Sequence, residues 1–280
     1  MSLSPSYQKF KDQIAAVLDS GRIITNPLQT FAYGTDASFY RLIPKMVLLV
    51  HSEAEVVAII KVANALNIAL TFRAAGTSLS GQAITDSVLV VATHGWKHYE
   101  LLDDKQKIKL EPGIVGARAN TFLAPHGLKI GPDPASIGAA MIGGIVANNA
   151  SGMCCGTAQN SYKTIADIRM ILHDGTVLDT ADAESVASFY ETQAHLIEEI
   201  KDLRHTIIAN PALEERIRQK FKIKNTTGYS INALVDYEDP IEIIKHLMVG
   251  SEGTLAFISN VTFKTVVDEK HNSCSLLIFN

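Results

Sequence analysis

A turn rich in small and hydroxyl residues, Arg73–Gln82, is the first part of this sequence whose residue types indicate chemistry. It reads Arg-Ala-Ala-Gly-Thr-Ser-Leu-Ser-Gly-Gln and follows an apolar run typical of a strand. Because little side-chain bulk is present, backbone N–H groups can approach an anion such as a diphosphate, and the serine hydroxyls add donors. A turn with only a structural role is the alternative interpretation.

The residues after the second glycine argue against a nucleoside-triphosphate loop. Gly76 and Gly81 have the spacing of that loop, but Gln82 and Ala83 stand where it needs Lys and Ser or Thr. Without the lysine, no cation reaches the terminal phosphates. The turn also lacks the G-x-G-x-x-G pattern of a nicotinamide-dinucleotide site, so both hypotheses are weak.

Two later stretches, Gly131–Gly152 and Gly250–Ile258, have related compositions. The first contains Pro-Asp-Pro, a Gly-Gly pair and Asn-Asn-Ala-Ser-Gly. So many small residues indicate that a flat molecule or another backbone lies against them, and tight backbone packing is the alternative. The second stretch, Gly-Ser-Glu-Gly-Thr-Leu-Ala-Phe-Ile, is by itself a loop that enters a strand.

A β-α-β unit must position the first turn. The apolar runs Met46–Val50 and Ala69–Arg73 predict strands, and the helix between them starts with Ser52-Glu-Ala-Glu55, which fits a capping box. Residues Val56, Ile59, Ile60 and Ala63 share one face of that helix. We therefore expect a parallel pair of strands joined by a crossover helix.

The rest of the chain adds helices and a last strand. Residues 1–43 are predicted to form a helical lead-in, and the polar helical pattern over 183–225 indicates a helical insertion. The apolar run Cys274–Phe279 is predicted to be a strand. The densest basic cluster, Arg216–Lys224, is interpreted as a solvated helix end.

Composition excludes several classes of protein. The chain has 280 residues, of which 47% are hydrophobic and 19% charged, and its net charge of −4 favours a globular protein that does not bind nucleic acid. No apolar run approaches the roughly 20 residues of a transmembrane segment, and no signal peptide is recognisable. We expect a cytoplasmic location, with peripheral docking at the inner membrane left open. Cys154, Cys155 and Cys274 are too few for a disulfide framework or a four-thiolate cluster.

The order of these motifs resembles the FAD-linked oxidases that carry the vanillyl-alcohol-oxidase (PCMH-type) FAD-binding domain. In that family a Gly-rich diphosphate loop follows the second strand, here Ala74–Gln82. A Pro-Asp-Pro segment then leads to Gly-Gly, here Pro132–Gly144, and Ala-Ser-Gly follows at Ala150–Gly152. A Glu-Gly-Thr-Leu-x-x-Ile element, here Glu252–Ile258, closes the domain.

The nearest resemblance within the family is to bacterial D-lactate and D-2-hydroxyacid dehydrogenases of the large FAD plus iron–sulfur type. It rests on Asn148–Gly156 and on Asn160-Ser-Tyr162. The implied fold class is α+β: a PCMH-type domain of two α/β subdomains over residues 44–266. Residues 267–280 would begin a cap (substrate) domain that is otherwise missing from a truncated chain, and an iron–sulfur cluster would lie only in a missing C-terminal region.

The resemblance also implies how the cofactor is held. Thr77 stands where relatives with covalent flavin carry His, so we expect non-covalent FAD. Ala74-Ala75 replaces a usual Gly pair, which the turn tolerates if both residues keep a negative φ. The cofactor-binding residues that it implies are Arg73, Ala74, Ala75, Gly76, Thr77, Ser78, Leu79, Gln82, Pro132, Asp133, Pro134, Ser136, Ile137, Met141, Gly143, Gly144, Asn148, Asn149, Ser151, Gly152, Glu252, Gly253 and Ile258.

The implied reaction is oxidation of a D-2-hydroxy acid, with D-lactate favoured, to the 2-oxo acid. FAD would accept the hydride, and a quinone or cytochrome, not a nicotinamide, would take the electrons. The catalytic base and the cation that holds the substrate carboxylate would come from the cap, so no catalytic residue and no metal ligand is assigned. The alternative is a flavin-binding module or subunit with no turnover of its own.

Overall fold

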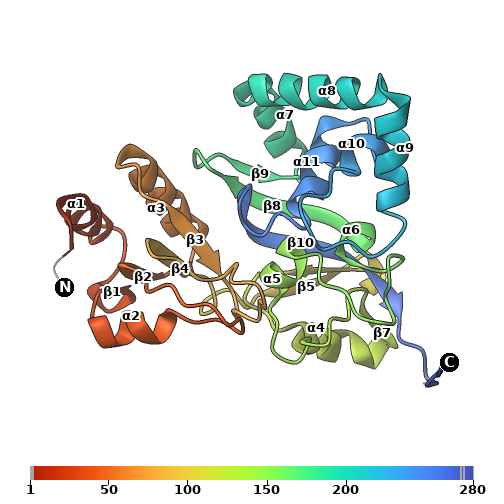
Figure 1. Cartoon of the computed structure of the whole chain (residues 1–280), viewed down its shortest axis with the longest axis horizontal. Helices are drawn as coiled ribbons and strands as arrows, with labels where there is room; N and C mark the ends of the chain where they lie inside the picture. The colour runs from red at the N-terminus through yellow and green to blue at the C-terminus, as the bar shows by residue number, and fades with distance from the viewer. Residues whose placement is uncertain (1–2, 272, 274, 280) are drawn as a thin grey trace.

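Two β-sheets, each with its own hydrophobic core, organise the chain into two lobes (Figure 1). The structure is a computed structural model that describes residues 3–271, 273 and 275–279. We call residues 3–98 the first lobe and residues 99–267 the second lobe.

The sheet of the first lobe has the order β1-β2-β4-β3, with β1 antiparallel and the other strands parallel. Its elements are α1 (Pro5–Ile14), the 3₁₀ turn η1 (Ser20–Arg22), β1 (Ile23–Ile24), α2 (Pro27–Tyr33), β2 (Met46–Leu49), α3 (Glu53–Ala65), β3 (Leu70–Arg73) and β4 (Val88–Val91). Alternate residues of the central strands point to opposite faces. Helices α1 and α3 cover one face, and α2 lies against the other.

Strand β4 lies between β2 and β3, so the expected β-α-β unit is parallel but its two strands are not neighbours. The expectation of two parallel strands joined by a crossover helix is confirmed, and β4 is inserted between them. The four residues of β4 are all apolar and buried, whereas β3 contains Thr71 and Arg73 and is only partly buried. The most apolar strand takes the central position because that position is covered on both faces.

Helix α3 confirms the predicted buried face of Val56, Ile59, Ile60 and Ala63. Its capping box forms only in part. The Ser52 hydroxyl accepts from the Glu55 N–H at 3.4 Å, but the Glu55 carboxylate accepts from the N–H of His51, at 2.7 Å, in place of that of Ser52.

The sheet of the second lobe is antiparallel, in the order β5-β6-β10-β8-β9, with β7 also pairing with β10. Its strands are β5 (Tyr99–Leu102), β6 (Lys107–Leu110), β7 (Leu128–Ile130), β8 (Ile165–Leu172), β9 (Val177–Asp179) and β10 (Ala256–Val267). Strand β10 is the centre of this sheet because it pairs with β6, β7 and β8.

Helices surround this second sheet. They are α4 (Gly116–Leu123), α5 (Ile142–Ala147), α6 (Ser161–Thr164), α7 (Ala183–Thr192), α8 (Ala194–Ile208), α9 (Pro211–Lys220), α10 (Ala233–Asp236) and α11 (Pro240–Met248), with 3₁₀ turns η2 (Asp103–Lys105) and η3 (Ala124–His126). Helices α7 to α11 gather on one side of β8 and β10, and α4 lies on the other (Figure 1). Helices α7 to α9 confirm the helical pattern predicted after residue 183. Among the described residues, none of the helices has the length and apolarity to cross a membrane.

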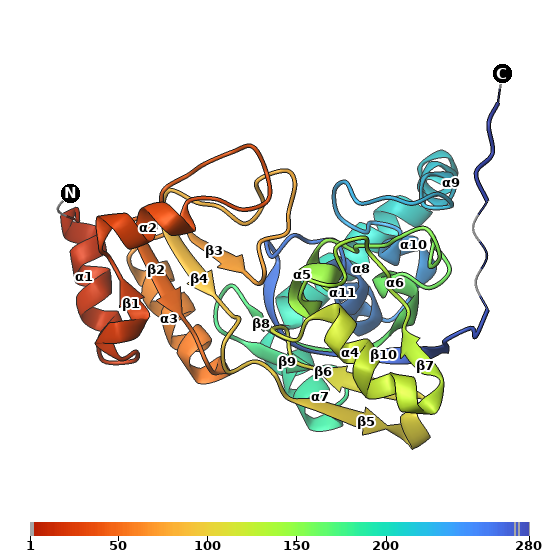
Figure 2. The same cartoon turned by 90° about the horizontal axis from the view of Figure 1, so that it is seen from below.

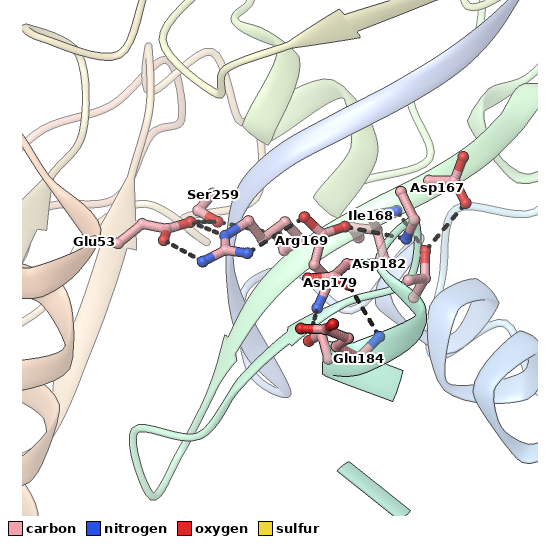
Figure 3. Close-up of polar contacts among 11 residues, drawn as sticks. Glu53, Asp167, Ile168, Arg169, Asp179, Asp182, Glu184 and Ser259 are labelled. Carbon is pink, nitrogen blue, oxygen red and sulfur yellow. Dashed lines mark hydrogen bonds and ion pairs between the residues drawn. The ribbon is translucent and has the colours of Figure 1, made fainter. Parts of the chain in front are cut away.

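A polar cluster joins the two lobes (Figure 3). Arg169 on β8 donates from Nε and Nη2 to the Glu53 carboxylate at the start of α3, at 2.7 and 3.0 Å, and from Nη1 to Asp179 at 3.3 Å. The Ser259 hydroxyl on β10 donates to the same Glu53 carboxylate. Burial alone would raise the pKa of Glu53, but these bonds hold it below its usual value. The charged form of Glu53 is therefore part of the junction.

An aromatic contact reinforces the junction. The ring of Phe257, at the start of β10, lies 5.1 Å from Phe72 and 5.4 Å from Trp96, both in the first lobe. Phe257 belongs to the first lobe's core although its strand belongs to the second sheet. The two lobes therefore share a continuous packed contact.

The expected strand Cys274–Phe279 is wrong for residues 275–279, which have no regular secondary structure. Cys274 lies outside the described residues. The apolar side chains of Leu276, Leu277, Ile278 and Phe279 are exposed, and none of the described strands pairs with them. An apolar run alone did not predict a strand here because a strand needs a hydrogen-bonding neighbour.

Arg169→Gln should lower the free energy of unfolding by about 1–3 kcal/mol, since it leaves the half-buried Glu53 carboxylate without its cation. Urea titration measures the change in the free energy of unfolding. Arg218→Gln is the matched control, because it breaks an exposed Arg218–Glu214 pair on α9 and should cost at most about 0.5 kcal/mol. Equal losses in the two variants would contradict a special role for the junction.

His246 on α11 makes a second prediction about stability. Burial lowers its pKa from 6.5 to about 4, so the unfolded chain binds a proton in this range that the folded chain does not. Stability is full above pH 6.5 and is lost as pH falls toward 4, by about 3 kcal/mol. His246→Phe, which keeps a ring against Tyr237, should flatten this part of the pH profile in urea titrations. An unchanged profile would refute the assignment.

Candidate functional site

A cavity of about 470 Å³ lies between the two lobes. The turn after β3 forms its wall in the first lobe. Helix α5, the Ser151 segment, the loop after α9 and the start of β10 form its wall in the second lobe. The end of β3 and helix α5 face each other (Figure 2), and residues of both line this cavity. Most of the stretches singled out by their composition therefore meet in one place.

The turn after β3 owes its shape to two glycines. Gly76 has φ +69° and Gly81 has φ +80°, in the left-handed region that favours glycine. Ala74 and Ala75 are absent from the described residues with positive φ, so they satisfy the condition for replacing a Gly pair. The side chains of Ser78 and Gln82 are hydrogen bonded to each other, which closes the turn.

The Arg73 guanidinium lies directly behind this turn. A Cβ atom at Gly76 would be 2.6 Å from Arg73 Nε. Arg73 Nη1 donates to the Tyr33 carbonyl at 3.0 Å. Burial lowers the pKa of Arg73, and the nearby Asp36 carboxylate opposes that shift. The group stays protonated at neutral pH and gives the turn a fixed positive charge.

The Gly-Gly pair of α5 has two different roles. A Cβ atom at Gly143 would lie 2.7 Å from Pro112 Cβ, so this glycine is required by packing. A Cβ atom at Gly144 would meet only Ala74 Cβ, at 3.9 Å. Gly144 is exposed to the cavity. Its missing side chain leaves open space opposite the turn.

Glu252 ties the loop before β10 to the end of α5. Its N–H donates to the Ala147 carbonyl at 2.8 Å, and Asn148 Nδ2 donates to its carboxylate at 2.6 Å. Glu252 has φ +54°, a conformation that non-glycine residues rarely adopt. Burial raises the pKa of Glu252 in spite of hydrogen bonds from Asn148 and Gln82. The strained backbone is thus held by contacts from both lobes.

Ser151 lines the cavity and has a buried hydroxyl with nothing bonded to it in the described part of the chain. The residue is only 7% exposed, and its Oγ has no hydrogen-bond partner among the described residues. A buried hydroxyl without a partner is uncommon and calls for an explanation, such as an atom of a bound molecule.

Most of the residues expected to bind a cofactor line this cavity. They are Arg73, Ala74, Ala75, Gly76, Thr77, Ser78, Leu79, Gln82, Pro134, Ser136, Met141, Gly143, Gly144, Asn148, Ser151, Glu252, Gly253 and Ile258. The remaining five, which do not line it, are Pro132, Asp133, Ile137, Asn149 and Gly152.

The five residues outside the lining shape the loops around it. The Asp133 carboxylate accepts N–H bonds from Gly152 at 2.8 Å and from Cys154 and Cys155 at 3.1 and 3.3 Å. A Cβ atom at Gly152 would lie 2.1 Å from the Asp133 carbonyl oxygen, so the two segments are in direct backbone contact. For these residues tight backbone packing, the alternative interpretation, describes the structure better than direct contact with a ligand.

The other three are used in local contacts of their own. The Asn149 side chain accepts from the N–H of Tyr162 at 3.3 Å, and the Ile137 carbonyl accepts from the N–H of Ala117 at 2.9 Å. Pro132 is buried and precedes Asp133 in the chain.

Sequence reasoning missed several residues of the lining. Phe72 and Phe257 contribute apolar walls, and Lys224, Thr226 and Thr227 come from the loop after α9. Lys224 is exposed, as the interpretation of Arg216–Lys224 as a solvated helix end implies, but it lies in the loop after α9 and its Nζ donates to the Ser151 carbonyl. No local pattern marks this lysine, because it reaches the cavity only through the path of the α7–α9 segment. Among the described residues, no group of three or more His, Cys, Asp or Glu side chains could hold a metal ion.

Comparisons with known proteins agree with this geometry. Residues 44–181 match the family described as the FAD binding domain. A D-2-hydroxyglutarate dehydrogenase of Haemophilus influenzae is 27% identical over 276 residues, covering 93% of this chain and 27% of the relative. The mitochondrial D-lactate dehydrogenase [cytochrome] 1 of Saccharomyces cerevisiae is 24% identical, covering 85% of this chain and 32% of the relative. Glycolate oxidase subunit GlcD of Escherichia coli is 35% identical over 120 residues, 42% of this chain and 24% of that subunit.

A solved structure shows the same fold. Alkyldihydroxyacetonephosphate synthase superposes with a TM-score of 0.63 at 15% identity, covering 96% of this chain and 42% of that one. The chain spans about a quarter to a third of the length of the curated relatives it matches. The fold with two sheets, the residues that meet between its lobes and the family match over 44–181 lead to one conclusion. Over residues 44–181, this chain resembles the proteins that carry the FAD binding domain.

Proposed function

We propose that this chain holds FAD non-covalently in the cavity between its lobes, as the flavin-binding part of a dehydrogenase for D-2-hydroxy acids. The proposal rests on the observation that segments far apart in sequence meet at one cavity. The Gly-rich turn, the Gly-Gly helix α5, Ser151 and the Glu252–Ile258 segment are far apart in sequence and line one cavity.

The residues present fit such a cofactor. Gly144 leaves open space opposite Ala74, where a side chain would fill the gap between the lobes. The buried Ser151 hydroxyl lacks a partner that a ligand atom would supply. A mostly apolar cavity with a few convergent polar groups is typical of small-molecule sites.

Within the proposal each segment has a role that its chemistry supports. The backbone N–H groups of Ala74–Ser78 hold the diphosphate, and Arg73 behind them balances part of its charge. Thr77 has no imidazole that could bond to the flavin, which favours non-covalent binding. The Glu252–Ile258 segment offers backbone groups at the other wall.

A second cavity, of about 450 Å³, adjoins the first. It is lined by β3, by the end of β8 and by the segment that enters β10, and it shares Gln82, Glu252 and Phe257 with the first cavity. Strand β3 is at the edge of its sheet, so its free side faces this space. The two cavities together offer room for an extended dinucleotide.

The proposed substrate class comes from the relatives. Their names include D-2-hydroxyglutarate and D-lactate dehydrogenases, so we propose a D-2-hydroxy acid of this kind, with D-lactate and D-2-hydroxyglutarate as the substrates to test. Bound FAD supplies the hydride acceptor for such an oxidation. A quinone or cytochrome is the proposed electron acceptor. This chain's residues bind and orient the cofactor, and we assign none of them as the base.

Gly144→Val should reduce FAD affinity at least about tenfold, because the new side chain occupies the space opposite Ala74, the one residue that its Cβ would approach within 4 Å. Equilibrium titration of the flavin-free chain with FAD measures the change. Gly138→Val is the matched control: its Cβ has open space around it and it does not line the cavity. Thermal unfolding should show that both variants fold. Unchanged FAD affinity in Gly144→Val would contradict the proposed binding site.

The reaction is tested on the FAD-loaded chain under anaerobic conditions. D-lactate or D-2-hydroxyglutarate should bleach the visible flavin band, and the L-enantiomers should not. Bleaching by neither acid, with FAD bound, would support the second candidate, a flavin-binding module with no turnover of its own.

A further inference from the structure

Few charged side chains line the cavity, and they differ in how many hydrogen bonds and ion pairs they make. Among the described residues, its ionisable lining side chains are Arg73, Glu252 and Lys224. Arg73 is fixed behind the Gly-rich turn by Tyr33 and faces Asp36. Glu252 is hydrogen bonded to Asn148, and its pKa is raised by burial. Lys224 is the cation whose role these contacts do not explain.

The ammonium group of Lys224 has N–H donors that are not used in the hydrogen bonds among the described residues. This group donates to the Ser151 carbonyl, which uses one of its three N–H donors. None of the ion pairs among the described residues includes Lys224, so no carboxylate neutralises it there. Lys224 is exposed, lines the cavity and has no counter-charge among the described residues, so its ammonium group is available for an anion.

Residues with hydroxyl groups line the same cavity. Ser151 is one of them, and its Oγ is buried and has no partner among the described residues. Thr226 and Thr227 line the cavity from the same loop as Lys224. One ammonium group and several hydroxyls together match the oxygens of a phosphate or carboxylate, since charge-assisted bonds to such oxygens are strong.

The position of this group separates it from the Gly-rich turn. The turn faces Gly144 near the start of α5, whereas Ser151 follows the end of that helix. Lys224 therefore adds positive charge near Ser151, whereas the charge of Arg73 lies behind the Gly-rich turn. A cofactor with a diphosphate, or a substrate with a carboxylate, brings negative charge that one arginine only partly balances.

We propose that Lys224 and Ser151 form an oxyanion subsite of this cavity. The inference rests on the proposed FAD-binding function and deepens it. The anion has two sources, a phosphate of the cofactor or the carboxylate of the hydroxy acid, and the chemistry of recognition is the same for both.

The test compares Lys224→Met, which keeps the aliphatic stem and removes the charge, with Lys222→Met. Lys222 is exposed, lies on the same loop and does not line the cavity. Ser151→Ala is a second variant that should fold normally, because its hydroxyl has no partner to lose. Dissociation constants are measured for FAD, for riboflavin, which has no phosphate, and for oxalate, through its effect on the bound flavin spectrum.

A cofactor-phosphate subsite predicts that Lys224→Met weakens FAD about tenfold or more and leaves riboflavin unchanged. A carboxylate subsite predicts unchanged FAD and a similar loss for oxalate. Ser151→Ala should weaken the same ligand, and Lys222→Met should match the wild type. Unchanged affinities for all three ligands in Lys224→Met would overturn the proposal.

The two proposals fail in different ways. If the wild-type chain binds neither FAD nor riboflavin, the proposed function is wrong. Calorimetry with pyrophosphate and oxalate on the flavin-free chain then tests the subsite by itself. Binding that Lys224→Met abolishes and Lys222→Met retains would support it, and the absence of such binding would refute it.

Discussion

The contact between Glu53 and Arg169 is the constraint on which the cavity depends. The two sheets fold around separate cores, and neither has all the walls of the site. Arg169 spans the junction with a two-point bond to Glu53 and a further bond to Asp179, and Phe257 packs beside it into the other lobe's core. A two-point bond fixes direction as well as distance. The turn after β3 is therefore held opposite α5 at a defined separation.

Contacts with helix α5 explain why Glu252 adopts an unusual conformation. Its loop must leave α11, pass the end of α5 and enter β10 just before Phe257. Backbone bonds to Val146 and Ala147 hold the loop against α5 while the side chain meets Asn148. Strain of this kind persists only where surrounding contacts determine it, and such places are often functional. Here the strained residue lies at the boundary that both cavities share.

Sequence predicts the parts of this protein that depend on neighbours along the chain. The buried face of α3 and the helices after residue 183 follow from apolar spacing. The positive φ of Gly76 and Gly81 follows from their place in a Gly-rich turn. The central place of β4 was not predicted, because strand order depends on which strand is buried on both faces. Most of the site was found through ordered motifs and their family resemblance. Lys224 was missed because only the three-dimensional path of a helical segment brings it to Ser151.

Strand β10 has a consequence for the order in which the chain acquires structure. It is the central strand of the second sheet, yet its register partners Leu110 and Ile168 lie far earlier in the sequence than its own Val261. Pairings across such long separations form slowly, because a large loop must close first. During synthesis β6 and β8 emerge long before their shared neighbour. A nascent chain that has not reached Ala256 has an open second sheet and lacks the part of the cavity wall that the start of β10 provides, so ligand binding of this kind requires synthesis to pass β10.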